Sequence, residues 1–354
     1  MCPSWYENRR FVTPPGGVSA SRKRIAPGMG KDAPGHENVI TGVATDYYAS
    51  ATGFEALVNS NYEGLRYIYG PERGFTLTVF GTDEFSEGSD GGHKHYNRYN
   101  PDLNANASMI REVWDRLYRT INATNATVDR ADDAAVSDSI RNVRVGEARF
   151  LRALYYLYLV QMYGPVPLPL TETRDVITEV TRAPTEEVYE AIIADLEFAE
   201  THLPMTQRDY GRATKPAAQF LMARAYLARG EEGDFETAAE YAKKVIDNPL
   251  FRLLPKFSDL WIPTNDKNAE VVFSVQYTAD PLLNAGSDGN RGHLYFTPEY
   301  EAVPGMLRDV LNGRPFRRFK PTNWLINLFD RTKDSRFAGT FKIAWIANNE
   351  ASIP

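Results

Sequence analysis

The segment from residue 144 to residue 168 carries the clearest hydrophobic pattern in the chain. Apolar side chains recur at helical spacing on one face, and more of them make the opposite side hydrophobic too. The two sets are Leu151, Leu154, Tyr155, Tyr158 and Met162, and Phe150, Leu157, Leu159 and Val160. A helix that is apolar all round must be enclosed by other helices. Gly164 can end it with a left-handed residue, and Pro165 and Pro167 prevent its continuation, so we predict a buried helix over 145–163 and then an extended strap.

Five more segments predict amphipathic helices. They run from a Ser50 or Thr52 cap to Tyr69, and over 106–128, 185–202, 215–229 and 235–248. The last two are joined by a Gly-Glu-Glu-Gly turn and carry alanines where two antiparallel helices would meet. This spacing resembles a tetratricopeptide repeat, in which helix pairs stack on one another. An ordinary helical hairpin is the alternative.

Outside these helices the pattern is irregular. After residue 249 loops dominate, with a strand-like run over 271–277 and a short predicted helix over 322–330. Residues 1–39 are rich in Pro, Gly, Lys and Arg without periodicity, so we predict a disordered or spurious N-terminal segment and one helical domain over 40–354. The predicted fold class is all-α, a tetratricopeptide-like helical repeat scaffold with loop-rich insertions and at most short strands.

Composition excludes several classes of function. The 354 residues are 43% hydrophobic, which is ample for a core, and no stretch approaches the length of a membrane span. The net charge of −6 is spread over mixed signs with no Lys/Arg stripe, which argues against nucleic-acid binding. Cys2 is the single cysteine, so the sequence allows no internal disulfide and no Cys-based zinc site.

Short motifs in a fixed order resemble the SusD/RagB family of surface glycan-binding lipoproteins. The motifs are EARFLRALYY (147–156), YGPVPL (163–168), RAPT (182–185), IADL (193–196), GRATKPAA (211–218), NAEVVF (268–273), KPT (320–322) and DSRF (334–337). They belong to an ordered set of matches from about Thr41 to Trp345. The chain is therefore identified as a member of this family.

The resemblance implies a function and a location. Members are cell-surface lipoproteins of a Gram-negative outer membrane that capture oligosaccharide and pass it to a SusC-like TonB-dependent transporter. In such a pair the helical repeats face the transporter and the loops face the glycan; neither chemistry nor a cofactor is implied. The lipidated cysteine of members follows a signal segment, whereas only Met1 precedes Cys2, so the sequence does not assign that role to Cys2. Relatives generally continue beyond the position of Pro354, so we expect a C-terminally incomplete member.

The connection over 81–106 is the first candidate for a ligand surface. A loop this long inside a helical domain is usually functional or disordered. The predicted contacts are Asp83, Lys94, Tyr96, Asn97 and Tyr99. The two rings offer flat apolar faces to a sugar, and the polar groups can bond its hydroxyls. The alternative is a solvated loop whose rings pack against helices, but family members build part of their glycan site from this connection.

A second patch of similar composition spans residues 284–296, which in relatives faces the first loop. Its predicted glycan contacts are Asn290, Arg291 and Tyr295. The alternative for Arg291 is a simple ion pair with a carboxylate, without a role in glycan binding.

No signature of catalysis or metal binding is complete. His93 and His95 alternate, but a third ligand and an HExxH motif are missing, and the acidic residues over 83–90 lack EF-hand register. Sequences of the GxSxG, Walker A and GxGxxG types are absent as well. We predict a glycan-binding protein without enzymatic activity, cofactor or metal. The alternatives are a protein-binding helical-repeat adaptor and a glycoside hydrolase, for which Asp83 and Asp288 are a conceivable carboxylate pair.

Overall fold

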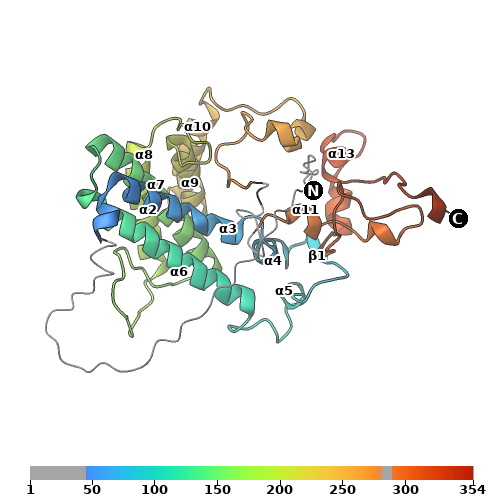
Figure 1. Ribbon diagram of the computed structural model, residues 1–354, viewed down its shortest axis with the longest axis horizontal. Helices are drawn as coiled ribbons and strands as arrows, with labels where there is room; N and C mark the ends of the chain where they lie inside the picture. The colour runs from blue at the N-terminus through green and yellow to red at the C-terminus, as the bar shows by residue number, and fades with distance from the viewer. Residues whose placement is uncertain (1–44, 279, 281–288, 354) are drawn as a thin grey trace, which may run out of the picture.

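The computed structural model describes residues 45–278, 280 and 289–353. The predicted N-terminal segment over 1–39, with Cys2, and residues 284–288 of the second patch lie outside these ranges. Figure 1 shows a group of packed helices at one end and loop-rich C-terminal segments at the other, with α3 and α4 between them. The all-α prediction is confirmed, because helices dominate and the described strands have three residues each.

The packed helices form the scaffold of the molecule. They are α2 (Ala51–Asn61), α3 (Leu65–Ile68), α6 (Ser108–Asp129), α7 (Asp138–Tyr163), α8 (Thr185–His202), α9 (Lys215–Arg229) and α10 (Asp234–Ile246). The loop-rich part contains α4 (Glu72–Val79), α5 (His95–Arg98), α11 (Gly292–Tyr295), α12 (Asn323–Leu328), α13 (Arg336–Thr340), β1 (Phe85–Glu87) and β2 (Phe319–Pro321).

The central helix α7 packs against α6 and α8 and is buried over most of its length. Its C-terminal end is where the sequence predicts it, and Gly164 follows with a φ of 69°, a value that favours glycine. Its start lies seven residues earlier than predicted, at Asp138. The reason is that the Ser137 hydroxyl accepts a hydrogen bond from the backbone N–H of Ile140 and so caps the first turn.

Side chains from the scaffold fix the strap that follows α7. The Tyr118 hydroxyl donates to the carbonyl of Pro167 at 2.7 Å, and the Tyr156 hydroxyl donates to the carbonyl of Pro169 at 2.7 Å. The Asn125 amide donates to the same Pro169 carbonyl at 2.9 Å. Side chains of α6 and α7 therefore supply these donors, and one backbone bond adds to them, since the N–H of Ala183 donates to the Val166 carbonyl at 2.9 Å.

Helices α9 and α10 form the predicted antiparallel hairpin. Thr214 caps α9, and the rings of Tyr226 and Tyr241 stack across the pair, with centroids 6.1 Å apart and planes inclined by 14°. Asp234 accepts two hydrogen bonds from Arg229, at 2.8 and 2.6 Å, which close the turn between the helices.

Two further local predictions differ from the structure. The first predicted helix is broken after Asn61, because the Tyr155 hydroxyl donates to the Asn61 carbonyl at 2.5 Å and a 3₁₀ turn intervenes before α3. The run over 271–277 is not a strand, and its Phe273 instead packs against Phe150 with ring centroids 5.2 Å apart. Helices α4, α5, α11 and α13 have no counterpart among the predicted helices.

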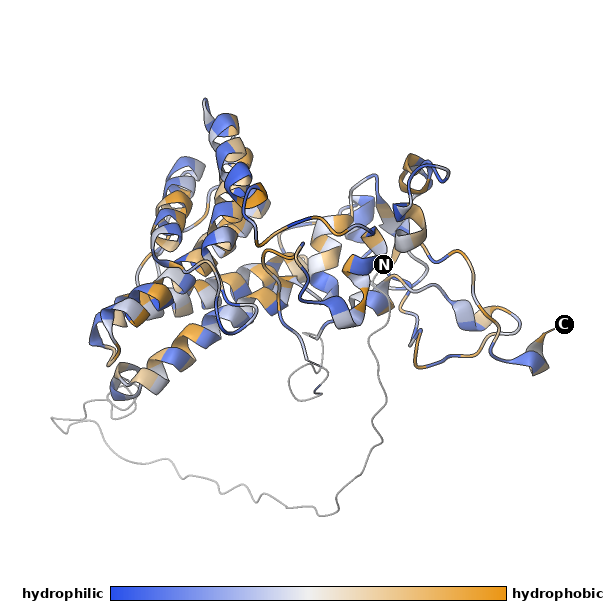
Figure 2. Ribbon diagram, turned by 90° about the horizontal axis from the view of Figure 1, so that it is seen from above, coloured by the Kyte–Doolittle hydropathy of each residue, from blue (hydrophilic) through white to orange (hydrophobic). Residues whose placement is uncertain are grey.

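An apolar surface lies on the C-terminal segments, whose ribbon carries hydrophobic stretches in Figure 2. Its side chains, each more than half exposed, include Val303, Leu307, Val310, Leu311, Ile343 and Ile346. The segments over 303–311 and 343–348 lie side by side, since the backbone N–H of Asn348 donates to the Gly305 carbonyl at 2.9 Å. Among the residues with described positions, no helix is both long and apolar enough to cross a membrane.

This surface predicts a response to hydrophobic dyes, because exposed contiguous apolar patches bind such probes or associate. Fluorescence of a bound dye is expected to fall when Val310 and Ile346 are both changed to lysine. The control is Val176→Lys, because Val176 is 91% exposed in the connection between α7 and α8. A dye signal that falls equally in the control would contradict the prediction.

Candidate functional site

A small antiparallel sheet joins the first candidate loop to the C-terminal segments. Phe85 pairs with Pro321, Ser86 with Lys320 and Glu87 with Phe319. The next residues continue the contact, since the backbone N–H of Gly88 donates to the carbonyl of Arg318 at 2.8 Å. The sheet therefore fixes one end of the connection over 81–106.

An aromatic cluster lies under this sheet. Phe75 of α4 contacts Phe296 and Phe319, with ring centroids 5.4 and 6.0 Å apart. Phe80 packs on Phe319 at 4.8 Å, and Phe85 packs on Phe296 at 5.4 Å. Contacts among these rings, centred on the buried Phe319, hold the two parts of the chain together, because offset and edge contacts add to the hydrophobic gain of aromatic pairs.

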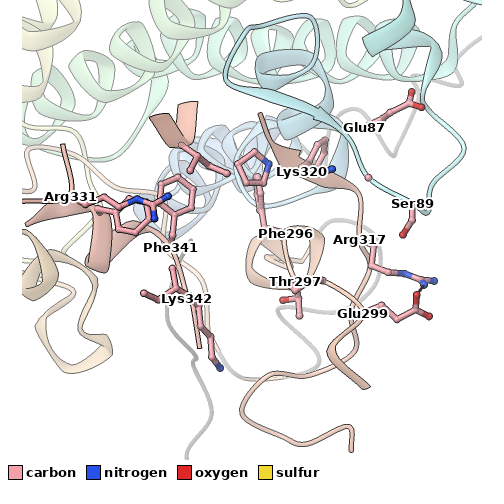
Figure 3. Close-up of a pocket in the computed structure, with 17 residues that line it drawn as sticks. Glu87, Ser89, Phe296, Thr297, Glu299, Arg317, Lys320, Arg331, Phe341 and Lys342 are labelled. Atoms are coloured by element: carbon pink, nitrogen blue, oxygen red, sulfur yellow. Dashed lines mark ion pairs between the residues drawn. The ribbon is translucent and has the colours of Figure 1, made fainter. Parts of the chain in front are cut away.

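A pocket of about 760 Å³ opens beside the sheet (Figure 3). It is lined by Glu87, Gly88 and Ser89 of the first loop, residues 296–299, Arg317, residues 319–321, Ile326 of α12, and Arg331, Phe337, Phe341, Lys342 and Ile343 around α13. Phe296, Ile326 and Phe341 are half-buried and give the pocket apolar walls, while charged groups stand at its rim. Such a combination is typical of small-molecule sites.

The two carboxylates of the pocket are both held by arginines. Arg98 Nε donates to Glu87 at 2.7 Å, and this hydrogen bond holds the pKa of Glu87 below its ordinary value. Glu299 forms an ion pair with Arg317, which also approaches Asp90 at 3.7 Å. A glycosidase acid needs a raised pKa. Glu87 is shifted in the opposite direction and is unsuited to that role.

Two of the predicted stacking rings are buried. Tyr96 and Tyr295 are each 5% exposed. The Tyr96 hydroxyl accepts hydrogen bonds from the backbone N–H groups of Met109 and Ile110, at 3.1 and 3.4 Å, and so caps α6. The Tyr295 ring packs against Phe316, with centroids 5.7 Å apart. Their burial corrects the expectation that both rings are free to stack on a sugar.

Tyr99 differs, because it is 68% exposed. It lies in the left-handed region at φ 51° and ψ 37°, which is uncommon for a residue other than glycine and is maintained only when the surroundings demand it. Its hydroxyl lies against Gly81, whose φ is 77°, and a Cβ at Gly81 would collide with it. The loop therefore presents one aromatic ring to solvent in a fixed orientation.

The remaining candidates are polar groups around the same loops. Asp83 is exposed, and its backbone carbonyl accepts a hydrogen bond from the Thr322 hydroxyl. Lys94 and Asn97 are half-buried at α5, and Lys94 donates to the Ser89 carbonyl at 3.4 Å. The Asn290 side chain accepts from the N–H of Gly292 at 3.1 Å, and the N–H of Arg291 donates to the Gly70 carbonyl at 3.3 Å.

None of the eight predicted residues lines the pocket. Both predicted segments nevertheless border it, because residues 87–89 belong to the first loop and Phe296 ends the second patch. The residues missed are Lys320, Arg331 and Lys342, together with their apolar neighbours. A signal for this site was present in the KPT and DSRF motifs, since Lys320, Pro321 and Phe337 line the pocket.

The histidine pair does not form part of a metal centre in the described ranges. No group of three or more His, Cys, Asp or Glu side chains within them could hold a metal ion. The rings of His93 and His95 have centroids 6.1 Å apart, and burial lowers the pKa of His93. Asp288, the second carboxylate of the conceivable hydrolase pair, lies outside the described residues.

Comparison with known proteins decides the family. A family model described as "Starch-binding associating with outer membrane" matches residues 47–227, just over half of the chain. This chain belongs to the SusD-like family. The match covers the scaffold from just before α2 to near the end of α9, and this range contains most of the motifs that suggested the resemblance.

Individual relatives agree with this assignment. The starch-binding protein SusD of Bacteroides thetaiotaomicron is 30% identical over 182 residues, covering 49% of this chain and 32% of that protein. SusD-like protein P2 of Formosa agariphila is 29% identical over 241 residues, covering 65% of this chain and 47% of that protein. The solved structure of a laminarin-binding SusD-like protein superposes with a TM-score of 0.70 at 23% identity. It covers 82% of this chain and 66% of that one, and the chain spans less than half of the two curated relatives.

Proposed function

We propose that this protein captures oligosaccharide at the surface of an outer membrane and performs no chemistry on it. The observation that carries the proposal is the SusD-like family match over the helical scaffold. In this proposal a lipid anchor holds the protein to the membrane, and a SusC-like TonB-dependent transporter receives the glycan. The helical repeats face the transporter, and the loops around β1 and β2 face the glycan.

The geometry of the loop region supports a glycan site there. Sugar rings present C–H faces, which pack on apolar walls, and hydroxyls, which need donors and acceptors. The pocket supplies Phe296 and Phe341 together with charged side chains, and Tyr99 is an exposed ring on the same connection as Glu87. The pairing of Glu87 with Arg98 argues against Glu87 as the acid of a glycosidase in this pocket.

The direct test is native affinity electrophoresis of the purified protein in gels that contain starch, laminarin, xyloglucan or acidic polysaccharides. Retardation is expected in at least one gel, with no new reducing ends after incubation with the same glycans. Release of reducing ends would establish the hydrolase alternative. If the protein showed neither retardation nor hydrolysis, the protein-binding adaptor would be favoured.

Tyr99→Ala is expected to weaken the tightest glycan of that panel by about 5- to 150-fold, equivalent to about 1–3 kcal/mol, because a stacked ring provides desolvated contact that water does not replace. Isothermal titration calorimetry measures the change. Asp83→Asn should have a smaller effect, because a lost hydrogen bond at a wet site is partly compensated by water.

Tyr47→Ala is the matched control, since Tyr47 is 48% exposed and precedes α2 in the scaffold. It should bind as the wild-type protein does. Equal affinities of the Tyr99→Ala variant and the wild-type protein would remove this ring from the site.

A further inference from the structure

The pocket beside the sheet has an excess of basic side chains, although the chain as a whole has a net charge of −6. Its basic lining residues are Arg317, Lys320, Arg331 and Lys342, and its acidic ones are Glu87 and Glu299. Both acidic residues are already paired, Glu299 with Arg317 and Glu87 with Arg98, which is not among the lining residues. The pocket therefore retains positive charge after its internal pairs are formed.

Three of the basic side chains are not neutralised. Within the described part of the chain, Lys320, Arg331 and Lys342 form no ion pair with a carboxylate, and all three are exposed. The Arg331 guanidinium lies 4.5 Å from the centre of the Phe337 ring. Lys342 Nζ lies 3.7 Å from the centre of the Trp345 ring and donates to Asn312 at 2.8 Å. Contacts with aromatic rings therefore hold the Arg331 and Lys342 side chains in position without neutralising their charges.

The walls between these charges are apolar. Figure 3 shows Arg331 and Lys342 at the end where Phe341 lies, and the Arg317–Glu299 pair at the opposite end. Charges of one sign around a low-dielectric wall concentrate the electrostatic potential inside a cleft. A neutral sugar needs only the walls and hydrogen-bonding groups, whereas an anionic sugar would also use the unpaired cations.

We infer that this pocket takes an anionic oligosaccharide, whose sugars carry the carboxylate groups of uronic acids or sulfate esters. The inference rests on the proposed glycan-binding function and adds the chemical class of the glycan. Arg331 can bond a carboxylate or sulfate through two parallel N–H groups, whereas Lys320 and Lys342 act as point charges. Phe296 and Phe341 contact the sugar faces between those groups. Positive charges at separate places in the pocket match an oligosaccharide with an acidic group on more than one sugar.

The first test compares charged and neutral forms of the same glycan by isothermal titration calorimetry. The probes are an oligogalacturonate with its carboxyl-reduced counterpart, and a sulfated carrageenan oligosaccharide with its desulfated counterpart, at low and at high salt. In at least one pair the charged glycan should bind at least about 10-fold more tightly than its neutral counterpart, because hydrogen bonds to ionised groups are stronger. High salt should reduce that preference through screening. The pair that shows the preference distinguishes carboxylate from sulfate.

The second test uses variants that remove one charge each. Arg331→Gln and Lys342→Gln should each weaken the charged glycan by about 10-fold and leave the neutral counterpart unaffected. Lys333→Gln is the matched control, because Lys333 has an 84% exposed side chain near Arg331 and does not line the pocket. It should bind both forms as the wild-type protein does.

Equal binding of charged and neutral glycans, or undiminished binding by both pocket variants, would overturn the inference and leave the proposed function intact. Binding of neutral glycans alone would likewise overturn the inference and leave the proposed function intact. If no glycan of either kind bound, the proposed function itself would fail together with the inference.

Discussion

Ala153→Glu is expected to abolish cooperative folding of the soluble protein. Ala153 is completely buried in α7, and the neighbouring Leu154 is 4% exposed. A carboxylate there would lose its hydration without gaining a partner, at a cost of several kcal/mol against a total stability of about 5–15 kcal/mol. Leu154→Asp should have the same outcome for the same reason. Thermal unfolding followed by circular dichroism measures the effect.

Ile140→Glu separates the effect of burial from the effect of a new charge in this helix. Ile140 lies in the first turn of α7 and is 49% exposed, so a glutamate there remains hydrated and lies near the positive end of the helix dipole. Its melting temperature should stay close to that of the wild-type protein. If Ala153→Glu melted as cooperatively as this control, α7 would not be the centre of the fold.

The helices were predictable because their signals are local. α8 and α9 have the predicted bounds, since a cap, an apolar stripe and a stop signal all lie within about twenty residues. The pairing of β1 with β2 joins residues 234 positions apart, and no turn signal marks such a contact. The pocket depends on that pairing, so the sequence alone did not place it.

Composition and loop context alone do not distinguish a ligand-binding tyrosine from a structural one. Tyr96 has the composition and loop context of a ligand-binding residue, yet its hydroxyl caps α6, where Ala107 offers no side-chain acceptor. Tyr99, three residues later, is exposed because the chain turns left-handed there. Only the backbone path distinguishes these two tyrosines.

The ordered motifs acquire a physical explanation from the structure, because separate motifs supply partners to one another. Glu147 of the first motif bonds Arg212 of the GRATKPAA motif at 2.9 Å. Arg152 of the first motif bonds Asp195 of the IADL motif at 2.7 Å. The sequence shows these motifs only as short matches in a fixed order. The structure shows that residues of different motifs form buried ion pairs with one another.

The Arg152–Asp195 pair should therefore be a major determinant of stability. Arg152 also donates to the Asn125 side chain at 2.8 Å and to the Leu170 carbonyl at 2.9 Å, and so ties α6, α8 and the strap to α7. Burial lowers the pKa of Arg152, but the hydrogen bond and charge of Asp195 outweigh it and leave this pKa raised. Arg152→Ala leaves the 3% exposed Asp195 without its hydrogen-bonded partner and should cost about 3–5 kcal/mol in urea unfolding.

A double-mutant cycle decides whether this cost comes from the pair. If it does, Arg152→Ala with Asp195→Ala should cost clearly less than the sum of the single changes, because the second removes the charge that the first leaves with only the 3.9 Å contact to Arg149. Full recovery is not expected, since Asn125 and the Leu170 carbonyl still lose a donor. Arg141→Ala removes the exposed pair with Asp138 from the same helix and should cost about 1 kcal/mol or less. Additive costs in the cycle would show that Arg152 acts through its packing and its hydrogen bonds to Asn125 and Leu170, and not through Asp195.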